Sequence, residues 1–329
     1  MTWIGLCVAC ALMGAEAADQ PTVVVVVGAA GSEEYGRQFT LWAERWQRAA
    51  ETGGARCLTV GLESSNGQSD RQRLQGLLRR ESLSGRGEFW LLLIGHGTFD
   101  GRSAKFNLRG PDVSAGELKE WLSEVDRPTA VINCASASGP FLRTLSAEGR
   151  IVISATKSGF EQNFARFGDY LSQTITDPAA DLDKDGQTSL LEAFLSASHR
   201  TQEFYRVEGR LPTEHALLDD NGDALGSRAD WFRGLRAIRD AGNGKALDGL
   251  RSHQRHLVRS RRERQLSAEQ RRRRDELELA VIQLRRSKSQ QTEQAYFQQL
   301  ERLLLQLADL YVPATAKRPQ PRRPVSRVN

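Results

Sequence analysis

The sequence predicts an α/β fold built on a mostly parallel, doubly wound sheet. Apolar segments at residues 22–27, 89–94, 129–133 and 150–156 have little polar alternation, which is typical of strands buried on both faces. Stretches with helical periodicity separate these segments, and strands that alternate with helices favour parallel pairing. We expect this sheet to lie within residues 19–176.

The elements follow one another in a regular order. The first strand leads through a glycine turn into a helix expected from Ser32 to Glu51. Further helices are expected near residues 69–80 and from Ser114, where Glu117 completes a capping box. The glycine turn has neither the G-x-G-x-x-G spacing nor a Walker lysine, so it does not predict nucleotide binding.

Reactive side chains follow two of the predicted strands. The segment 89–94 ends in Gly95-His96-Gly97, and the segment 129–133 runs into Cys134-Ala135-Ser136-Ala137-Ser138-Gly139. Ligands of open α/β sheets bind beyond the carboxyl ends of the strands. A histidine base and a cysteine or serine nucleophile are therefore expected to meet at this edge.

This pair of strand ends resembles the caspase–legumain–gingipain group of cysteine peptidases, in which one strand ends in His-Gly and the next in Ala-Cys-x-Ser-Gly. The resemblance covers roughly residues 20 to 176 and implies a caspase-like fold with a peptide or protein substrate. It implies that His96 is the base, that Cys134 is the nucleophile, and that the Gly97 N–H belongs to the oxyanion hole.

The nucleophile has two alternative positions. When the motif is aligned on Ser138-Gly139, the nucleophile position falls on Ser136 and Cys134 lies two residues early. A thiol needs only a neighbouring histidine, whereas a serine hydroxyl needs a fully oriented base. Three hypotheses follow: a cysteine peptidase using Cys134, a serine version using Ser136, or a catalytically inactive scaffold or binding protein.

The resemblance also implies a substrate pocket. In the family, the turn after the first strand and the loop after the fourth shape the pocket for the substrate side chain. Here these places hold Glu33 and Glu34, and then Lys157, Glu161 and Asn163. An acidic pocket would favour a basic substrate residue, although acidic residues in a first helical turn are commonly partners of the helix dipole.

A calcium loop is predicted at residues 181–192, which match the D-x-D-x-D-G-x5-E pattern of an EF-hand. A glycine marks the sharp turn, and the residues at ligand positions are Asp181, Asp183, Asp185, Gln187 (through its carbonyl) and Glu192. We expect Ca²⁺ to brace the structure here. Residues 219–223 also have oxygen-bearing side chains at alternate positions and a glycine, but no closing glutamate follows. They are either a partial second calcium site or an Asx-rich turn. His215, beside Glu214, is interpreted as structural. The combination of the His-Gly strand end, the Ser-Gly turn, the calcium loop and residues 214–219 also resembles exported caspase-like proteins of bacteria.

The first 18 residues have the pattern of a secretory signal peptide. An apolar core at residues 3–14 precedes Ala15-Glu16-Ala17, and the segment is too short to span a bilayer as a stable helix. We expect export to the periplasm, the cell envelope or the medium, with no transmembrane span in the mature chain. Removal of the segment leaves Cys57, interpreted as a core residue, and Cys134 as a free thiol.

The C-terminal third is basic. From residue 251 onward, 19 Lys and Arg residues stand against 8 Asp and Glu residues. Leucines at three- and four-residue steps predict two amphipathic helices that pair as a hairpin within residues 241–312. A calcium-loop extension is expected at 177–240 and a disordered Pro/Arg tail at 313–329. The basic helices suit an anionic surface or an acidic partner; nucleic acid is not expected, because no recognised motif or aromatic interleaving is present.

Overall fold

The structure is a computed structural model that describes residues 20–63, 67–82, 85–239 and 247–312. The predicted signal peptide and the predicted disordered tail lie outside the described residues. The chain divides into two compact units, one ending at Ser260 and the other beginning at Arg261.

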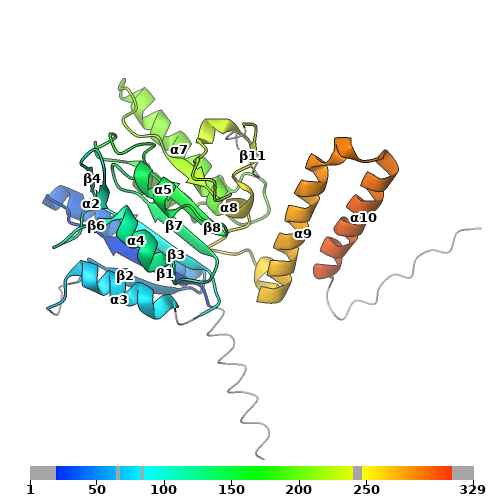
Figure 1. Ribbon diagram of the computed structural model, residues 1–329, viewed down its shortest axis with the longest axis horizontal. Coiled ribbons are helices and arrows are strands. Elements are labelled where there is room, and N and C mark those ends of the chain that lie inside the picture. Colours follow the sequence, from blue (N-terminus) through cyan, green and yellow to red (C-terminus); the bar gives the residue numbers. More distant parts are fainter. Residues whose placement is uncertain (1–19, 64–66, 83–84, 240–246, 313–329) are drawn as a thin grey trace, which may run out of the picture. The chain divides into compact units, whose positions relative to one another are not determined.

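A six-stranded sheet forms the centre of the first unit (Figure 1). In spatial order its strands are β2 (Arg56–Val60), β1 (Thr22–Val27), β3 (Phe89–Ile94), β7 (Thr129–Asn133), β8 (Arg150–Ser154) and β9 (Leu217–Asp219). The first five are parallel, and β9 runs antiparallel to β8 at the edge. The predicted α/β class with a mostly parallel sheet is confirmed.

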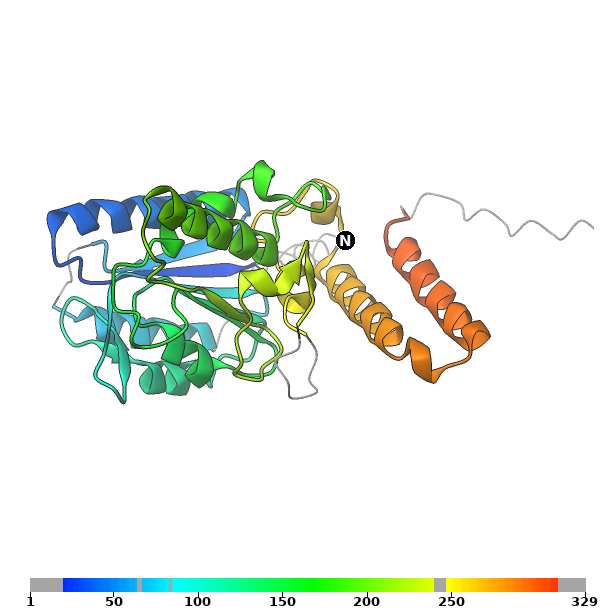
Figure 2. The ribbon, with the colours of Figure 1, turned by 90° about the horizontal axis from the view of Figure 1, so that it is seen from above.

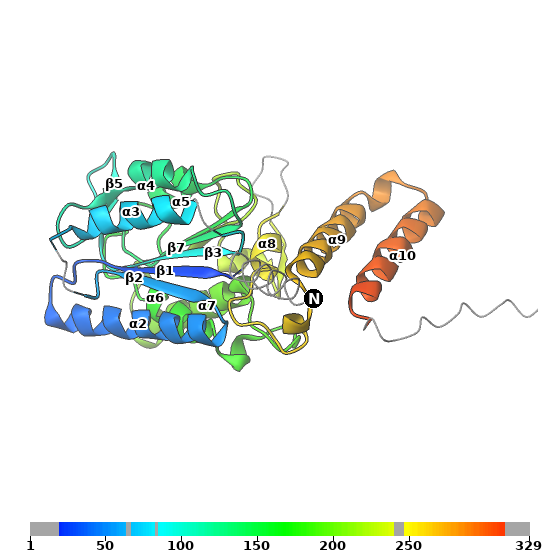
Figure 3. The same cartoon turned by 90° about the horizontal axis from the view of Figure 1, so that it is seen from below.

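Helices cover both faces of the sheet, as Figures 2 and 3 show. One face carries α2 (Glu33–Thr52), α6 (Phe167–Thr174) and α7 (Leu190–Val207), and the other carries α3 (Asp70–Ser82), α4 (Ala115–Leu122) and α5 (Gly139–Leu145). Successive side chains of a strand point to opposite faces. In β3, Trp90 therefore packs into one core and Leu91 into the other.

Local signals in the sequence account for the helix starts. The Ser32 hydroxyl accepts a hydrogen bond from the backbone N–H of Tyr35 and caps α2. The capping box predicted at Ser114 and Glu117 is present at the start of α4. A second capping box, between Ser189 and Glu192, begins α7.

Smaller elements complete the first unit. An antiparallel sheet follows His96 and contains β4 (Gly97–Phe99), β5 (Ala104–Phe106) and β6 (Val113–Ser114). The remaining elements are η1 (Pro178–Ala180), η2 (Ala229–Trp231), β10 (Phe232–Arg233), β11 (Arg236–Ala237) and α8 (Leu250–His253).

Residues 247–260 belong to the first unit, whereas the sequence predicts a helical module from residue 241 onward. Side-chain hydrogen bonds attach this segment to the sheet edge. Asp248 accepts from the backbone N–H of Asp220 (3.0 Å), and Asp220 accepts from the backbone N–H of Ser252 (2.8 Å). Isolated polar residues of this kind carry no periodic signal, so the sequence pattern did not indicate the attachment.

The second unit is a helical hairpin, as predicted. Its elements are η3 (Glu263–Gln265), α9 (Ala268–Arg286), η4 (Lys288–Gln290) and α10 (Glu293–Leu310). Helices α9 and α10 pack against each other, with Leu277, Val281 and Leu284 of α9 and Tyr296 of α10 buried. Across the described residues, no helix combines the length and the apolar character that a membrane span requires.

Candidate functional site

His96 follows the carboxyl end of β3, where the sequence predicted a base. Its Nε2 atom lies 3.1 Å from the carbonyl oxygen of Ala30, and its ring packs edge-on against Tyr35 and Phe39, with ring centres 4.8 and 5.1 Å away. A carbonyl oxygen only accepts, so Nε2 carries the proton in this contact. The ring is therefore oriented by the turn after β1 and by the aromatic side chains of α2.

Ser136 lies against Gly97. Its hydroxyl accepts a hydrogen bond from the Gly97 N–H (3.2 Å) and donates one to the Gly97 carbonyl oxygen (3.1 Å). A Cβ atom at Gly97 would lie 2.2 Å from the Ser136 carbonyl oxygen, so only glycine permits this approach. The structure thus brings Ser136 and Gly97 together, with the serine hydroxyl buried and doubly bonded to backbone.

The turn after Ser136 is held by the loop that follows β8. Ala137 has a φ of +53°, a left-handed conformation that costs free energy in a residue other than glycine. Its N–H donates to the carbonyl oxygen of Glu161 (2.8 Å), and the Ser138 and Thr156 hydroxyls bond each other (3.2 Å). These contacts fix the backbone between β7 and α5.

Cys134 lies in the core. A Cβ atom at Gly168 of α6 would lie 3.1 Å from the Cys134 sulfur and 2.9 Å from the ring of Trp42, so the thiol is enclosed between helices. Burial, and then the negative charge of Glu214, raise the pKa of the Cys134 thiol to about 12. Within the described residues, no hydrogen bond joins His96 to Cys134 or to Ser136.

The other residues implied as a substrate pocket have varied surroundings. Glu33 forms an exposed ion pair with Arg37 (2.6 Å), and Glu34 is also exposed on the first turn of α2. Asn163 is exposed. Glu33 and Glu34 therefore lie on the solvent side of the helix, where acidic residues complement the helix dipole.

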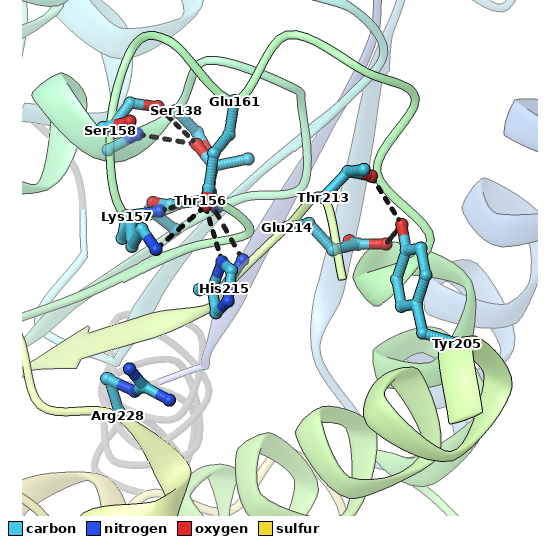
Figure 4. A network of polar contacts seen from close by, with 12 residues as sticks. Ser138, Thr156, Lys157, Ser158, Glu161, Tyr205, Thr213, Glu214, His215 and Arg228 are labelled. Atoms are coloured by element: carbon cyan, nitrogen blue, oxygen red, sulfur yellow. Dashed lines mark hydrogen bonds and ion pairs between the residues drawn. The ribbon is translucent and has the colours of Figure 1, made fainter. Parts of the chain in front are cut away.

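A paired histidine and glutamate at the sheet edge did not emerge as a site from the sequence. His215 Nδ1 lies 2.5 Å from Oε1 of Glu161, and the other Glu161 oxygen accepts the backbone N–H of Lys157 (2.9 Å) (Figure 4). The partners His215 and Glu161 lie 54 positions apart, so spacing gives no signal for the pair. Adjacent to it, buried Glu214 accepts the backbone N–H groups of Arg166 and Phe167 at the start of α6 (2.9 and 3.0 Å).

The predicted calcium loop has converging carboxylates. Oxygens of Asp181, Asp183 and Asp185 lie within 4.8 Å of one another. Positive φ angles at Lys184 (+63°) and Gly186 (+89°) turn the backbone around this point. Burial raises the pKa of Asp185, and the charges of Asp183 and Glu192 add to the rise. A hard cation would relieve this repulsion, so the donor set fits Ca²⁺.

Glu192 and Gln187 have bonds of their own in this loop. One Glu192 oxygen accepts the N–H groups of Leu182 (2.7 Å) and Asp183 (3.3 Å), and the other accepts from Ser189 in the capping box. The Gln187 side chain donates to Asp185 (2.9 Å) and accepts from the Ser260 N–H (3.0 Å), which leaves the position-7 ligand role to its carbonyl. Glu192 thus faces back onto the loop, as the closing residue of an EF-hand must.

The second acidic turn has the same hydrogen-bond scheme as the calcium loop. Asp219 accepts hydrogen bonds from the N–H groups three and five residues later, those of Gly222 and Ala224. Asp181 likewise accepts from the N–H groups three and five residues later in the calcium loop. Asp223 accepts from Leu225 two residues on (2.7 Å), as Asp185 accepts from Gln187. These bonds account for the Asx-rich turn that was one of its two interpretations.

Comparison with known proteins gives structural likeness at low identity. No protein-family model matches the chain, and no curated protein matches its sequence. Among solved structures, the initiator caspase Dronc of Drosophila has 12% identity and a TM-score of 0.42, covering 62% of this chain and 80% of that one. Caspase-1 of Spodoptera frugiperda has 8% identity and a TM-score of 0.39 over 61% and 87%. Raptor of Chaetomium thermophilum has 13% identity and a TM-score of 0.32 over 48% of this chain and 17% of that one.

Proposed function

We propose that this chain is a caspase-like protein in which the peptidase centre is not assembled, and that it acts as a binding or scaffold protein. One observation supports the proposal above the others. The hydroxyl of Ser136 is bonded to Gly97, the thiol of Cys134 lies in the core, and within the described residues neither has a hydrogen bond to His96.

The surroundings of Cys134 and of Ser136 each oppose a step of peptide hydrolysis. A thiol with a pKa of about 12 is ionised in about one molecule in 10⁵ at pH 7, and the thiolate is the nucleophile. A serine nucleophile needs a histidine nitrogen that accepts its proton. Nε2 of His96 donates to a carbonyl, which leaves Nδ1 as the ring nitrogen able to accept a proton. Within the described residues, however, no hydrogen bond joins this ring to Ser136, whose proton is directed to the Gly97 carbonyl oxygen.

A serine peptidase is the second candidate, and one contact favours it. The Ser136 hydroxyl lies 3.2 Å from the Gly97 N–H, the group that the family resemblance places in the oxyanion hole. Catalytic hydrogen bonds are often incomplete before a substrate binds. Under this candidate, substrate binding would bring Nδ1 of His96, the ring nitrogen that does not bond Ala30, within reach of Ser136.

The proposal includes Ca²⁺ as a structural ion held by Asp181, Asp183, Asp185, the Gln187 carbonyl and Glu192. The converging oxygens and the repulsion that raises the pKa of Asp185 support it. The ion would neutralise the loop and fix the start of α7, where Glu192 also forms the capping box.

The proposal also includes export and a role for the C-terminal hairpin. The apolar segment at residues 3–14 and the Ala15-Glu16-Ala17 signal support export. Residues 261–329 hold 16 Lys and Arg residues against 8 Asp and Glu residues, which supports contact with an anionic surface or an acidic partner.

Covalent probes test the proposal at both nucleophile positions. Native protein is treated with iodoacetamide for Cys134 and with a fluorophosphonate for Ser136, and labelled sites are identified by peptide mass spectrometry. We expect Cys134 to label far more slowly than the half-buried Cys57, and Ser136 to remain unlabelled. Fast labelling at either position that is lost in a His96→Ala variant would establish a peptidase centre instead.

A further inference from the structure

A pocket separate from the strand-end site lies at the edge of the sheet, beside β9. Its volume is about 450 Å³, within the range of small-molecule sites. One wall is the second half of α7, with Ser198 and Arg206, and the opposite wall is formed by His215 before β9 and by Arg228 and Asp230 at η2. None of these residues belongs to the site implied by the family resemblance.

Arg228 brings hydrogen-bond donors that the protein does not use. Its Nε atom pairs with Asp230 (3.0 Å), and neither of its two terminal nitrogens has a hydrogen-bond partner within the described part of the chain. Arg206, by contrast, has its Nε and one terminal nitrogen in a bidentate pair with Glu203 (2.7 and 2.5 Å). The available end of Arg228 therefore presents a planar pair of N–H donors in the pocket wall.

His215 and Ser198 add polar groups. Glu161 fixes the His215 ring through Nδ1 (2.5 Å), which leaves Nε2 for a ligand; Figure 4 shows this pair with Arg228 nearby. The Ser198 hydroxyl oxygen is buried and has no hydrogen-bond partner among the described residues. A buried hydroxyl without a partner is uncommon in native proteins, so it is a second indication of a missing ligand or water.

We propose that this pocket binds a carboxylate group, carried by a small organic acid or by the C-terminal end of a peptide. The end of a guanidinium group matches the two oxygens of a carboxylate in a planar, bidentate fit. The pocket lining also contains Glu203, Glu214 and Asp230, two of which are paired with Arg206 and Arg228, so the lining has no excess positive charge. Repulsion by these carboxylates is twice as large for a dianion such as phosphate as for a singly charged carboxylate, which favours the latter. A carboxylate beside Arg228 would accept hydrogen bonds from its terminal nitrogens. The same ligand would give Nε2 of His215 and the hydroxyl of Ser198 the hydrogen-bond partners that they lack within the described residues.

Calorimetric titration of the full-length protein tests this proposal. The probes are N-acetylalanine and acetylated trialanine, each compared with its C-terminal amide. The variants are Arg228→Gln and Ser198→Ala, with Arg233→Gln as the control, because Arg233 is an exposed arginine of β10 outside the pocket lining.

At least one acid should bind saturably while its amide does not. Arg228→Gln should weaken binding about tenfold or more, the loss expected for a hydrogen bond to a charged group, while Arg233→Gln leaves it unchanged. Ser198→Ala should weaken binding without lowering the melting temperature, since its hydroxyl makes no bond in the protein. Binding of N-acetylalanine identifies a small acid as sufficient, and binding of the trialanine acid alone identifies a peptide end.

Three results would overturn the proposal. The first is that no acid binds, and the second is that acids and amides bind equally. The third is that Arg228→Gln and Arg233→Gln weaken binding to the same extent, which would indicate a general charge effect. None of these depends on whether the strand-end site is catalytic.

Discussion

At the scale of residues, Cys134 and Ser136 occupy very different surroundings although they are two positions apart. Cys134 directly follows the last residue of β7 and keeps the core-facing direction, where Gly168 and Trp42 enclose it. After it the chain turns, with a left-handed residue at Ala137, and Ser136 meets Gly97. The turn, rather than the identity of the side chains, decides which residue reaches the end of β3.

The sequence left this choice open for a physical reason. The alternation of a strand predicts to which face a side chain points only for residues within that strand. The segment that contains Cys134 and Ser136 begins where β7 ends. The alignment on Ser-Gly puts Ser136 at the nucleophile position, and the structure places its hydroxyl against Gly97. No sequence pattern indicated that His96 would bond Ala30, which lies 66 positions away. Aromatic packing from α2 onto His96 likewise depends on tertiary structure.

The burial of Cys134 predicts that a serine substitution there destabilises the protein more than a serine substitution at Cys57. Cys134→Ser places a hydroxyl in an apolar site and should lower the free energy of unfolding by about 1–3 kcal/mol, because the hydroxyl loses its bonds to water. Cys57→Ser, at a half-buried position of β2, should cost less. Urea unfolding measures both. If both substitutions changed the free energy of unfolding by the same small amount, Cys134 would be accessible to solvent, as a nucleophile must be.

Asp248 predicts a dependence of stability on pH. Burial, and then the charge of Asp220, raise the pKa of Asp248 well above its usual range. The folded state therefore keeps a proton that the unfolded chain releases above about pH 4, so this group makes the protein less stable as the pH rises. The slope for one proton is at most about 1.4 kcal/mol per pH unit.

Asp248→Asn tests this directly. Asparagine keeps an oxygen for the N–H groups of Asp220 and Asn221 and cannot ionise. Thermal unfolding from pH 5 to 8 should show a weaker decline in the variant than in the wild type, with the gain largest at pH 8. An Asp126→Asn variant, at an exposed position, serves as the control. Parallel pH profiles for all three proteins would refute the assignment.

Among the strands and helices, the sequence predicted β1, β3, β7, β8, α2, α3 and α4, because their signals are local. The β-branched run of β1 and the apolar run of β3 are buried along their whole lengths, as uninterrupted apolar strands require. The capping box at Ser114 marked the start of α4. The edge strand β9 was not predicted, because its three residues are too few for periodicity.

The calcium loop predicts a stability shift that depends on one side chain. Ca²⁺ should raise the melting temperature of the wild type, by the equivalent of about 2.7 kcal/mol when the ion is at 100 times its Kd. Asp185→Asn should abolish most of this shift. Its matched control is Asp223→Asn, which changes the corresponding residue of the second turn and the same backbone bond.

Differential scanning calorimetry with Ca²⁺ and with a chelator measures these shifts. If Ca²⁺ raised the melting temperature of Asp185→Asn as much as that of the wild type, residues 181–192 would not be the calcium site. A shift that is lost only in Asp223→Asn would move the calcium site to the second acidic turn.

At the scale of the whole molecule, charge and packing divide the chain. The basic residues that the sequence located in the C-terminal third fall largely in the second unit, and α9 holds a buried Arg274 paired with Glu263 of the same unit. Leucine periodicity predicted the hairpin. The boundary was predicted at residue 241, whereas the second unit begins at Arg261, because residues 247–260 are held to the first unit by the bonds of Asp248 and Ser252 to Asp220.

Truncation after Ser260 tests the independence of the first unit. The shortened chain keeps the Ser260–Gln187 bond and both cores, so it should unfold cooperatively at the melting temperature of the full-length protein. Circular dichroism during heating measures this. A large fall in the melting temperature would mean that the helical hairpin stabilises the α/β unit.

We propose that His96, Ser136 and Cys134 do not form a peptidase centre. The most direct test is mass-spectrometric profiling of cleavage in a diverse peptide library, with Ca²⁺ present, for the wild type and for His96→Ala and Ser136→Ala. We predict the same background cleavage in all three preparations. Sequence-selective cleavage by the wild type that disappears in both variants would contradict the account and identify a serine peptidase.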